Sequence, residues 1–211
     1  MAEATRPIAR RFGWGLMTVF ATLIGAYALA NALVPGLRTP FVAELFASRA
    51  ARAFGHMGFG GIALFTGALQ FSTRLRFDRP ATHRLVGKIY IVTVLVSGVS
   101  AGLLAPMSTG GVTAHFGFGL LALLWLGTTS AAWITVRRGA YDAHRVWMIR
   151  SYALCLAAVT LRLYLPLAGI AGLPFEVSYP AIAWLCWVPN LVVAEWFVVG
   201  SSLAPLEPVG S

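Results

Sequence analysis

Charge is scarce in this sequence of 211 residues, since only 11% are Asp, Glu, Lys or Arg while 58% are hydrophobic. A soluble domain averages about 25% charged residues, so the composition excludes an ordinary water-soluble globular protein. Cysteine is scarcer still. The two cysteines, Cys155 and Cys186, fall at different depths of two apolar segments, which predicts buried packing thiols and no disulfide bond.

Long apolar runs take the place of the missing charge. A transmembrane helix needs roughly 20 predominantly apolar residues, and six stretches reach that length. We therefore predict an all-α integral membrane protein in which residues 1–211 form a single membrane domain with six transmembrane helices. The predicted spans cover residues 12–34, 53–73, 85–106, 115–136, 146–168 and 181–200. The first span also resembles a signal peptide, but the length of its apolar run favours a retained helix.

The few charges present are mostly positive: sixteen Lys and Arg face seven Asp and Glu. Twelve of the sixteen fall in three clusters, at the N-terminus, in 74–88 and in 137–150. With six crossings these clusters share one side of the membrane, and the positive-inside rule makes that side cytoplasmic. We expect the bacterial cytoplasmic (inner) membrane, with both termini inside and lipid around the helices. The excess of positive charge thus reflects the orientation of the chain in the membrane, and we expect no nucleic-acid partner.

Two phrases occur twice along the chain. "HMGFGGIAL" at 56–64 is repeated as "HFGFGLLAL" at 115–123, and "HRLVGKIY" at 83–90 is echoed by "HRVWMIRSY" at 144–152. The offsets are similar, 115 − 56 = 59 and 144 − 83 = 61. This predicts a duplicated two-helix unit, with spans 2 and 3 repeated as spans 4 and 5 to form a central four-helix core.

All four histidines of the chain belong to these repeated phrases. His56 and His115 begin spans 2 and 4 near the outer face, whereas His83 and His144 begin spans 3 and 5 near the inner face. Two imidazoles that face each other between helices are the ligand set of a bis-histidine haem. We therefore predict two b-type haems, one near each face, with these four histidines as the metal ligands.

Further residues are predicted to line the haem sites. Five glycines near the histidines leave space for a porphyrin: Gly58, Gly60, Gly117, Gly119 and Gly87. Met148 stands where the second inner phrase should repeat Gly87, which departs from the pattern. Five cations near the histidines are expected to hold haem propionates or an anionic redox partner: Arg52, Arg84, Lys88, Arg145 and Arg150. We also expect Arg150 to be the mate of Glu195.

Arg162 lies inside a predicted span, where a charge is costly and usually functional. It follows His144 by eighteen residues, which is about 27 Å of helix. This rise brings Arg162 to the depth of the outer histidine pair, where a propionate is the expected partner.

The pattern resembles the six-helix transmembrane dihaem b-type cytochromes, which move electrons from ascorbate, quinol or superoxide across a membrane. In that family, histidines of spans 2 and 4 bind one haem and those of spans 3 and 5 bind the other. The resemblance covers the central core. A second resemblance, to a family of uncharacterised bacterial polytopic membrane proteins, is carried by "HRLVGKIY" and by "AHRVWMIRSYALCLAAVTLRL" at 143–163. It covers most of the chain and implies no function.

The function we expect is a transmembrane electron carrier of the oxidoreductase class that exchanges electrons with a quinone or a small anionic redox partner. Two alternatives remain open. A small transporter or proton pathway suits the repeats and Arg162, although we expect no span to be interrupted at mid-membrane. A haem-free accessory subunit, bound to a partner membrane subunit, would use the histidines as interfacial anchors and the glycines for helix packing.

Overall fold

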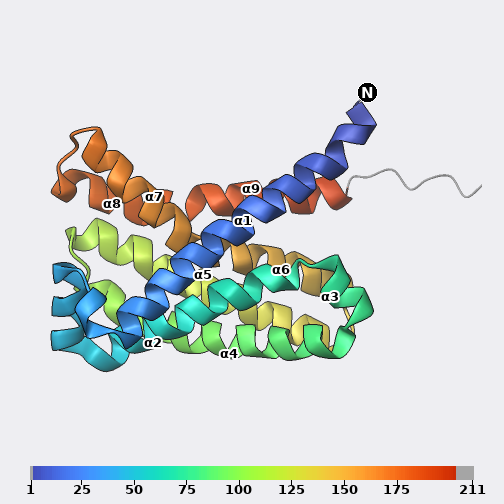
Figure 1. Ribbon diagram of the computed structural model, residues 1–211, viewed down its shortest axis with the longest axis horizontal. Coiled ribbons are helices and arrows are strands. Elements are labelled where there is room, and N and C mark those ends of the chain that lie inside the picture. The colour runs from blue at the N-terminus through green and yellow to red at the C-terminus, as the bar shows by residue number, and fades with distance from the viewer. Residues whose placement is uncertain (1, 203–211) are drawn as a thin grey trace, which may run out of the picture.

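The computed structural model describes residues 2–202, with side chains described for 12–196 and for Val198 (Figure 1). These residues form helices and no strand. The helices are α1 (Ala2–Leu33), η1 (Pro35–Leu37), α2 (Pro40–Gln70), α3 (Thr73–Asp78), α4 (Pro80–Leu104), η2 (Ala105–Met107), α5 (Gly111–Arg137), α6 (Tyr141–Cys155), α7 (Ala157–Ile170), α8 (Phe175–Leu185) and α9 (Val188–Ser202). The all-helical prediction is confirmed for this part of the chain.

The connections between the helices follow ordinary turn chemistry. The Thr39 side chain caps α2 by accepting a bond from the Val42 N–H, and Pro40 occupies the first turn, where its missing N–H costs nothing. Gly139 and Gly172 have positive φ angles of 75° and 70° and end α5 and α7. Glycine adopts this left-handed conformation without steric cost, so the chain reverses sharply at both positions.

The central bundle consists of α2, α4, α5 and α6. Helix α2 packs against α4, α4 against α5, and α5 against α6, while α2 also touches α6 and closes the ring. Helix α1 covers α2 and crosses the bundle diagonally (Figure 1). Helix α9 lies along α6, and α7 and α8 form a hairpin at the end of the bundle opposite the N-terminus. Spans 2, 3 and 4 and the first half of span 5 therefore lie in one bundle, whereas the second half of span 5 is α7, which packs on α8 and α1.

The centre of the bundle is filled by aromatic side chains. Tyr90 of α4 and Tyr152 of α6 are 0% and 1% exposed, and their ring centroids lie 6.3 Å apart. They fit because α2 carries Gly67 at this level: a Cβ atom there would meet Tyr152 and would lie 2.7 Å from Tyr90. Because Gly67 has no side chain, the two large rings can pack across the bundle axis.

Five segments are long and apolar enough to cross a membrane by length and composition: Phe12–Leu33, Pro80–Met107, Gly111–Arg137, Tyr141–Ile170 and Phe175–Trp196. The segment predicted as the second span, residues 53–73, is not among them. It is the C-terminal part of α2, whose five glycines and one histidine between 53 and 70 reduce its hydropathy. Six crossings and the duplicated unit therefore stay predictions.

The expectation of unbroken spans is wrong for two of the five segments. Tyr141–Ile170 consists of α6 and α7, which are separated at Leu156, and Phe175–Trp196 consists of α8 and α9, which are separated at Cys186 and Trp187. Both interruptions fall near the middle of their segments. Leu156 has ψ of −8°, away from the helical value, so the backbone changes direction there.

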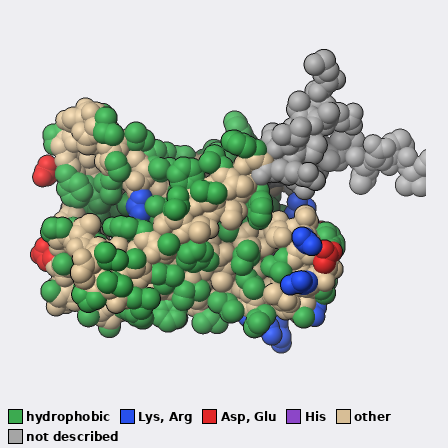
Figure 2. Space-filling model, viewed as in Figure 1, with side chains coloured by type: hydrophobic (Ala, Val, Ile, Leu, Met, Phe, Trp, Pro, Cys, Tyr) green, Lys and Arg blue, Asp and Glu red, His purple; other side chains and the backbone are tan. Residues whose placement is uncertain are grey.

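The surface of the bundle agrees with a membrane location. Large apolar side chains point outwards along its length, as at Leu23, Leu123 and Trp196, which are 59%, 66% and 79% exposed. Figure 2 shows Lys and Arg side chains gathered at the end of the bundle formed by α3 and the start of α4. The chain is thus a membrane protein whose sides contact lipid and whose basic end marks the expected cytoplasmic face.

Candidate functional site

The two inner histidines lie in the first turns of α4 and α6, at the basic end of the bundle. His83 and His144 are close enough for their charges to interact, although α4 and α6 are diagonal neighbours in the bundle. His144 Nδ1 lies 2.8 Å from the carbonyl oxygen of Ala132 in α5, which holds the imidazole plane in place. The structure therefore places the two inner histidines at the same end of the bundle, in the first turns of two different helices.

His83 has an unusual environment. Its Nδ1 atom is buried and has no hydrogen-bond partner among the described residues. The positive charges of Arg76 and Arg84 act on its imidazole. A buried polar nitrogen without a partner costs free energy and calls for an explanation such as a missing ligand. Of the four histidines, only His83 has such an orphaned ring nitrogen.

Gln70, the last residue of α2, lies beside His83 at the start of α4. Its Nε2 donates to the His83 carbonyl oxygen over 3.4 Å, and its Oε1 lies 3.1 Å from the position that a Cβ atom on Gly87 would take. The space predicted beside Gly87 is thus occupied by the Gln70 side chain. Lys88, also predicted for this site, is exposed.

The outer histidines are held by different neighbours. The Ser97 hydroxyl donates to the His56 carbonyl oxygen over 2.9 Å and lies 3.4 Å from His56 Nδ1. His115 Nε2 lies 2.9 Å from the carbonyl oxygen of Ser108, in the loop that precedes its own helix. These contacts leave no buried ring nitrogen without a partner at the outer pair.

The glycines of the repeated phrase face neighbouring helices. A Cβ atom on Gly58 would lie 3.8 Å from Ala32 of α1, and one on Gly60 would lie 3.0 Å from the Ser97 hydroxyl of α4. A Cβ atom on Gly117 would lie 3.0 Å from the backbone of Ala183 in α8. Gly119 is looser, at 3.9 Å from Ala105. The close approaches at Gly60 and Gly117 account for these two glycines by helix packing, the alternative that the sequence leaves open, whereas a Cβ atom on Gly58 or Gly119 would make only ordinary van der Waals contact.

Arg162 of α7 lies near His56, at the depth that helix rise indicates, and its charge acts on that imidazole. Its guanidinium donates to the Ala158 carbonyl oxygen over 3.0 Å and its Cζ lies 5.3 Å from the ring centre of Tyr27 in α1. Arg162 forms no ion pair with a carboxylate among the described residues. A cation inside a span, without an acidic partner, remains available for an anionic group.

Two further predicted cations, Arg150 and Arg52, have other partners. Arg150 forms a bidentate ion pair with Glu195 of α9, with distances of 2.6 and 2.8 Å, and its guanidinium also lies over the Trp147 ring. The predicted pairing of Arg150 with Glu195 is confirmed. Arg52 points to the sulfur of Met107 in a pocket at the outer end of the bundle. These contacts do not direct Arg150 or Arg52 towards either histidine pair.

A sequence-family comparison matches residues 53–198 to the family described as predicted membrane protein (DUF2306). The chain belongs to this family. The match begins at residue 53 in α2 and ends at residue 198 in α9. It therefore includes the four histidines and Arg162. The resemblance to uncharacterised polytopic membrane proteins is thereby supported, and no match to a cytochrome b family accompanies it. Searches of curated proteins and of solved structures found no match to this chain.

Sequence reasoning missed a chain of buried hydroxyls inside this family member. The Tyr90 hydroxyl and the Thr129 hydroxyl lie 2.8 and 2.7 Å from the Ser151 hydroxyl, and Thr129 in turn donates to the Trp125 carbonyl oxygen. The available signal in the sequence was the presence of Thr129 and Ser151 inside apolar segments. A buried hydroxyl needs a hydrogen-bond partner, so two such residues can be expected to bond each other.

It also missed the polar link between the two interrupted segments. Asn190 donates to the carbonyl oxygens of Ala153 and Cys186 over 3.3 and 3.0 Å, and Thr160 donates to the Cys186 carbonyl oxygen. These carbonyls lie in the last turn of α6 and at the end of α8, where the regular helical bonds stop. The side chains satisfy backbone groups that the interruptions expose. Both cysteines are free and buried, as predicted.

Proposed function

We propose that this membrane protein is a b-type cytochrome whose four-helix core binds haem and carries electrons across the bilayer. One observation carries the proposal: the buried, unpartnered Nδ1 of His83 beside His144. A ligand at this place would satisfy the nitrogen that the protein leaves alone. Bound haem would supply one-electron redox chemistry, with its potential tuned by the ligands and by the burial of the site.

The inner pair fits a bis-histidine ligand set in two respects. A metal-ligating histidine usually donates its second ring N–H to a carbonyl or a carboxylate, which fixes both the tautomer and the plane of the ring. The contact of His144 Nδ1 with the Ala132 carbonyl has this form and leaves Nε2 for a metal. The positive charges of Arg76 and Arg84 beside His83 suit the carboxylates of a propionate-bearing group.

The role of Gln70 in this account is to position His83. Its bond to the His83 carbonyl ties the end of α2 to the first turn of α4. Helix α4 begins with Pro80, and His83 N–H bonds to the Arg79 carbonyl, so the histidine stands on a well-formed first turn. The imidazole is therefore held by rigid elements, as a ligand site requires.

A second haem at His56 and His115 is proposed from the repeat, with Arg162 as the cation for its propionate. This site needs a rearrangement, because His115 Nε2 is bonded to the Ser108 carbonyl and would have to turn, or ligate through Nδ1. The Ser97 hydroxyl lies beside His56 Nδ1 and would hold the ring of the other ligand in place. The two sites thus differ in how far they are prepared for a metal. The partner we propose is a quinone or a small anionic redox molecule.

The experiment is haem quantification by the pyridine haemochrome method on purified variants. His83→Ala and His144→Ala should each remove the same haem, and the double variant should lose little more, because both ligands serve one iron. His56→Ala should remove a different haem, so that its loss adds to that of His83→Ala. Arg138→Ala, at an exposed position, is the matched control and should keep the full content. Separate, additive losses for His83→Ala and His144→Ala would refute the inner pairing.

A small transporter or proton pathway is the second candidate, and the two interrupted segments favour it. Transporters bind substrates and ions where helices are broken near the bilayer midplane. Here α6–α7 and α8–α9 are both interrupted near their middles and are linked there by Thr160 and Asn190. A colourless protein from haem-replete cells, with ion-dependent flux in proteoliposomes that Asn190→Ala abolishes, would support this candidate over the first.

A further inference from the structure

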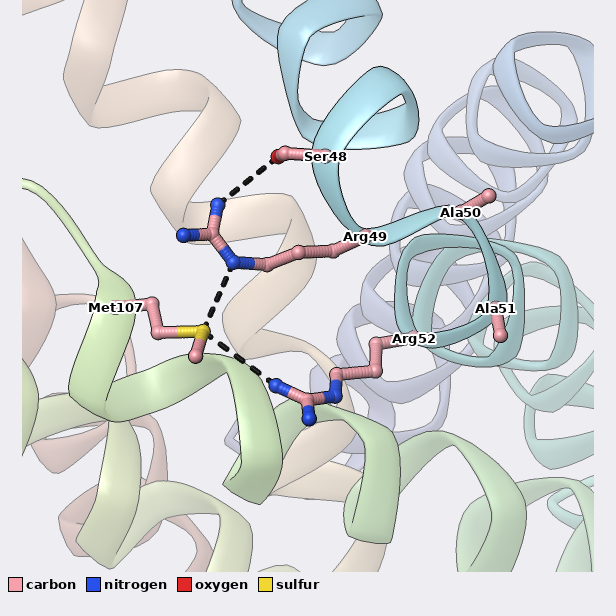
Figure 3. Close-up of a pocket in the computed structure, with 6 residues that line it drawn as sticks. All are labelled: Ser48, Arg49, Ala50, Ala51, Arg52 and Met107. Atoms are coloured by element: carbon pink, nitrogen blue, oxygen red, sulfur yellow. Dashed lines mark hydrogen bonds between the residues drawn. The ribbon is translucent and has the colours of Figure 1, made fainter.

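A pocket opens at the outer end of the bundle, where α2 bends beside η2 (Figure 3). Its volume is about 410 Å³. We name it the arginine pocket; the residues that line it are Ser48, Arg49, Ala50, Ala51, Arg52 and Met107. None of these lining residues is a histidine, so the arginine pocket is separate from the proposed haem sites.

The bend in α2 shapes the arginine pocket. Arg49 has φ of −149° and ψ of 45°, which lies outside the helical region although the residues on both sides are helical. This interruption changes the direction of the helix between Ser48 and Ala50. As a result, the side chains of Arg49 and Arg52 approach the same point from two sides, as Figure 3 shows.

The two guanidinium groups meet at a weak acceptor. Arg49 Nε lies 2.8 Å and Arg52 Nη1 lies 3.5 Å from the sulfur of Met107. A thioether sulfur accepts hydrogen bonds poorly, whereas each guanidinium carries five N–H donors. The one further side-chain bond is from Arg49 Nη1 to the Ser48 hydroxyl, at 3.0 Å.

Among the described residues, no carboxylate forms an ion pair with Arg49 or Arg52. The ion pairs found among the described residues are Arg74 with Asp78 and Arg150 with Glu195, and neither involves the arginine pocket. Two like charges that converge on one sulfur atom repel each other, and a negative group between them would convert the repulsion into attraction. Both arginines are half-buried, so water screens them only in part.

We propose that the arginine pocket binds a phosphate oxyanion at the outer face of the membrane. Two guanidinium groups, each with five N–H donors, suit the several oxygens of a phosphate better than the two oxygens of a carboxylate, and Arg recognises phosphate by paired N–H bonds. The phosphate belongs either to a soluble phosphate or to the headgroup of an anionic lipid. The apolar lining from Ala50, Ala51 and Met107 accommodates both.

The test measures phosphate binding by the purified full-length protein. In lipid-free detergent at low ionic strength, inorganic phosphate is titrated calorimetrically into the wild type and into Arg49→Gln/Arg52→Gln. We expect the double variant to bind on the order of tenfold more weakly or worse, because charge-assisted bonds are lost. Arg79→Gln/Arg138→Gln removes the same net charge from two exposed positions and is the matched control. It should bind like the wild type, and added salt should weaken binding in both.

A second arm identifies the source of the phosphate. Wild type and variants are reconstituted in nanodiscs of phosphatidylcholine with a minority of phosphatidylglycerol, and the lipid that remains after delipidation is counted by mass spectrometry. Retention of phosphatidylglycerol that the double variant loses identifies a headgroup, whereas calorimetric binding without such retention identifies a soluble phosphate. Met107→Leu and the single variant Arg52→Gln keep the test valid if the double variant misfolds: the first should bind normally and the second weakly. Absence of both kinds of binding in the wild type, or equal binding by the double variant, overturns the proposal.

Discussion

The imidazole of His144 is fixed by a backbone atom of another helix: its Nδ1 lies 2.8 Å from the carbonyl oxygen of Ala132. Ala132 is fully buried, and its carbonyl lies in the C-terminal part of α5, near the turn to α6. The bond therefore couples the orientation of the ring to the packing of α5 on α6. In the proposed haem site this bond would fix the tautomer and the plane of the ring.

The ion pair between Arg150 and Glu195 should hold α9 against α6. Arg150→Leu or Glu195→Leu leaves the other charge unpaired, and we expect each to lower the free energy of unfolding by about 1–3 kcal/mol, because the side chains are partly exposed. The double leucine variant should recover much of this loss. Thermal unfolding in detergent measures all three. Simple addition of the two single losses would show that the pair is not coupled.

Gly67 should be intolerant of a side chain. In Gly67→Ala the new methyl group would meet Tyr152 and would lie 2.7 Å from Tyr90, so two large buried rings must move. We expect a loss of about 1–3 kcal/mol in the free energy of unfolding. Gly127→Ala is the control, since nothing lies within 4 Å of its added Cβ and helix propensity should even gain up to ~1 kcal/mol. Equal stabilities would contradict the packing described for the core.

The orientation of the chain can be tested by thiol labelling. Asp78→Cys and Tyr141→Cys place new thiols at exposed positions of the expected cytoplasmic end, whereas Val177→Cys places one at the other end. An impermeant maleimide added to intact cells should label only position 177. Cys155 and Cys186 are buried and give little background. Labelling at 78 and 141 from outside would reverse the orientation and with it the names of both sites.

Arg162 should influence the outer pair alone, because its charge acts on His56 and no contact links it to His83 or His144. Arg162→Leu is expected to shift the potential or the occupancy of one haem and to leave the other nearly unchanged. Spectroelectrochemical titration separates the two components. Arg145→Leu, which removes a charge at the inner end, is the comparison. Equal shifts in both haems after Arg162→Leu would indicate a general structural role.

Much of the helical framework was predictable, because apolar runs directly report contact with lipid. The predicted span 115–136 agrees closely with α5, and 85–106 agrees with the apolar part of α4. Helix α2 is longer than the predicted span. It begins at Pro40, and the charged residues of its first turns lie outside the apolar run from which the span was predicted. The apolar composition of a segment indicates which residues lie in the bilayer. The length of a helix depends instead on its caps and hydrogen bonds.

The interruptions at Leu156 and at Cys186 could not be read from the sequence with the same ease. Leu156 is an ordinary helix former, and the Ala153 carbonyl beside the bend accepts a bond from Asn190 of α9. Pro189 was the one local signal, because proline lacks the N–H that a continuous helix needs at that place. Tertiary contacts of this kind leave little trace in local periodicity.

The candidate site was predictable in its membership and less so in its geometry. Repeated phrases identified the four histidines, and helix rise brought Arg162 to the depth of His56. The direction in which each side chain points depends on helix rotation, which is why Gly58 and Gly117 face α1 and α8 and why His115 turns to Ser108. Gln70 was missed because a single polar residue at the end of an apolar run is common.

The most direct test of the haem proposal is the dithionite-reduced minus oxidised absorption spectrum of the purified wild-type protein from haem-replete cells. Our account predicts a Soret shift and a sharp alpha band of a low-spin b-type haem, with at least one haem per chain by pyridine haemochrome. A well-folded, colourless protein with no difference spectrum would contradict it.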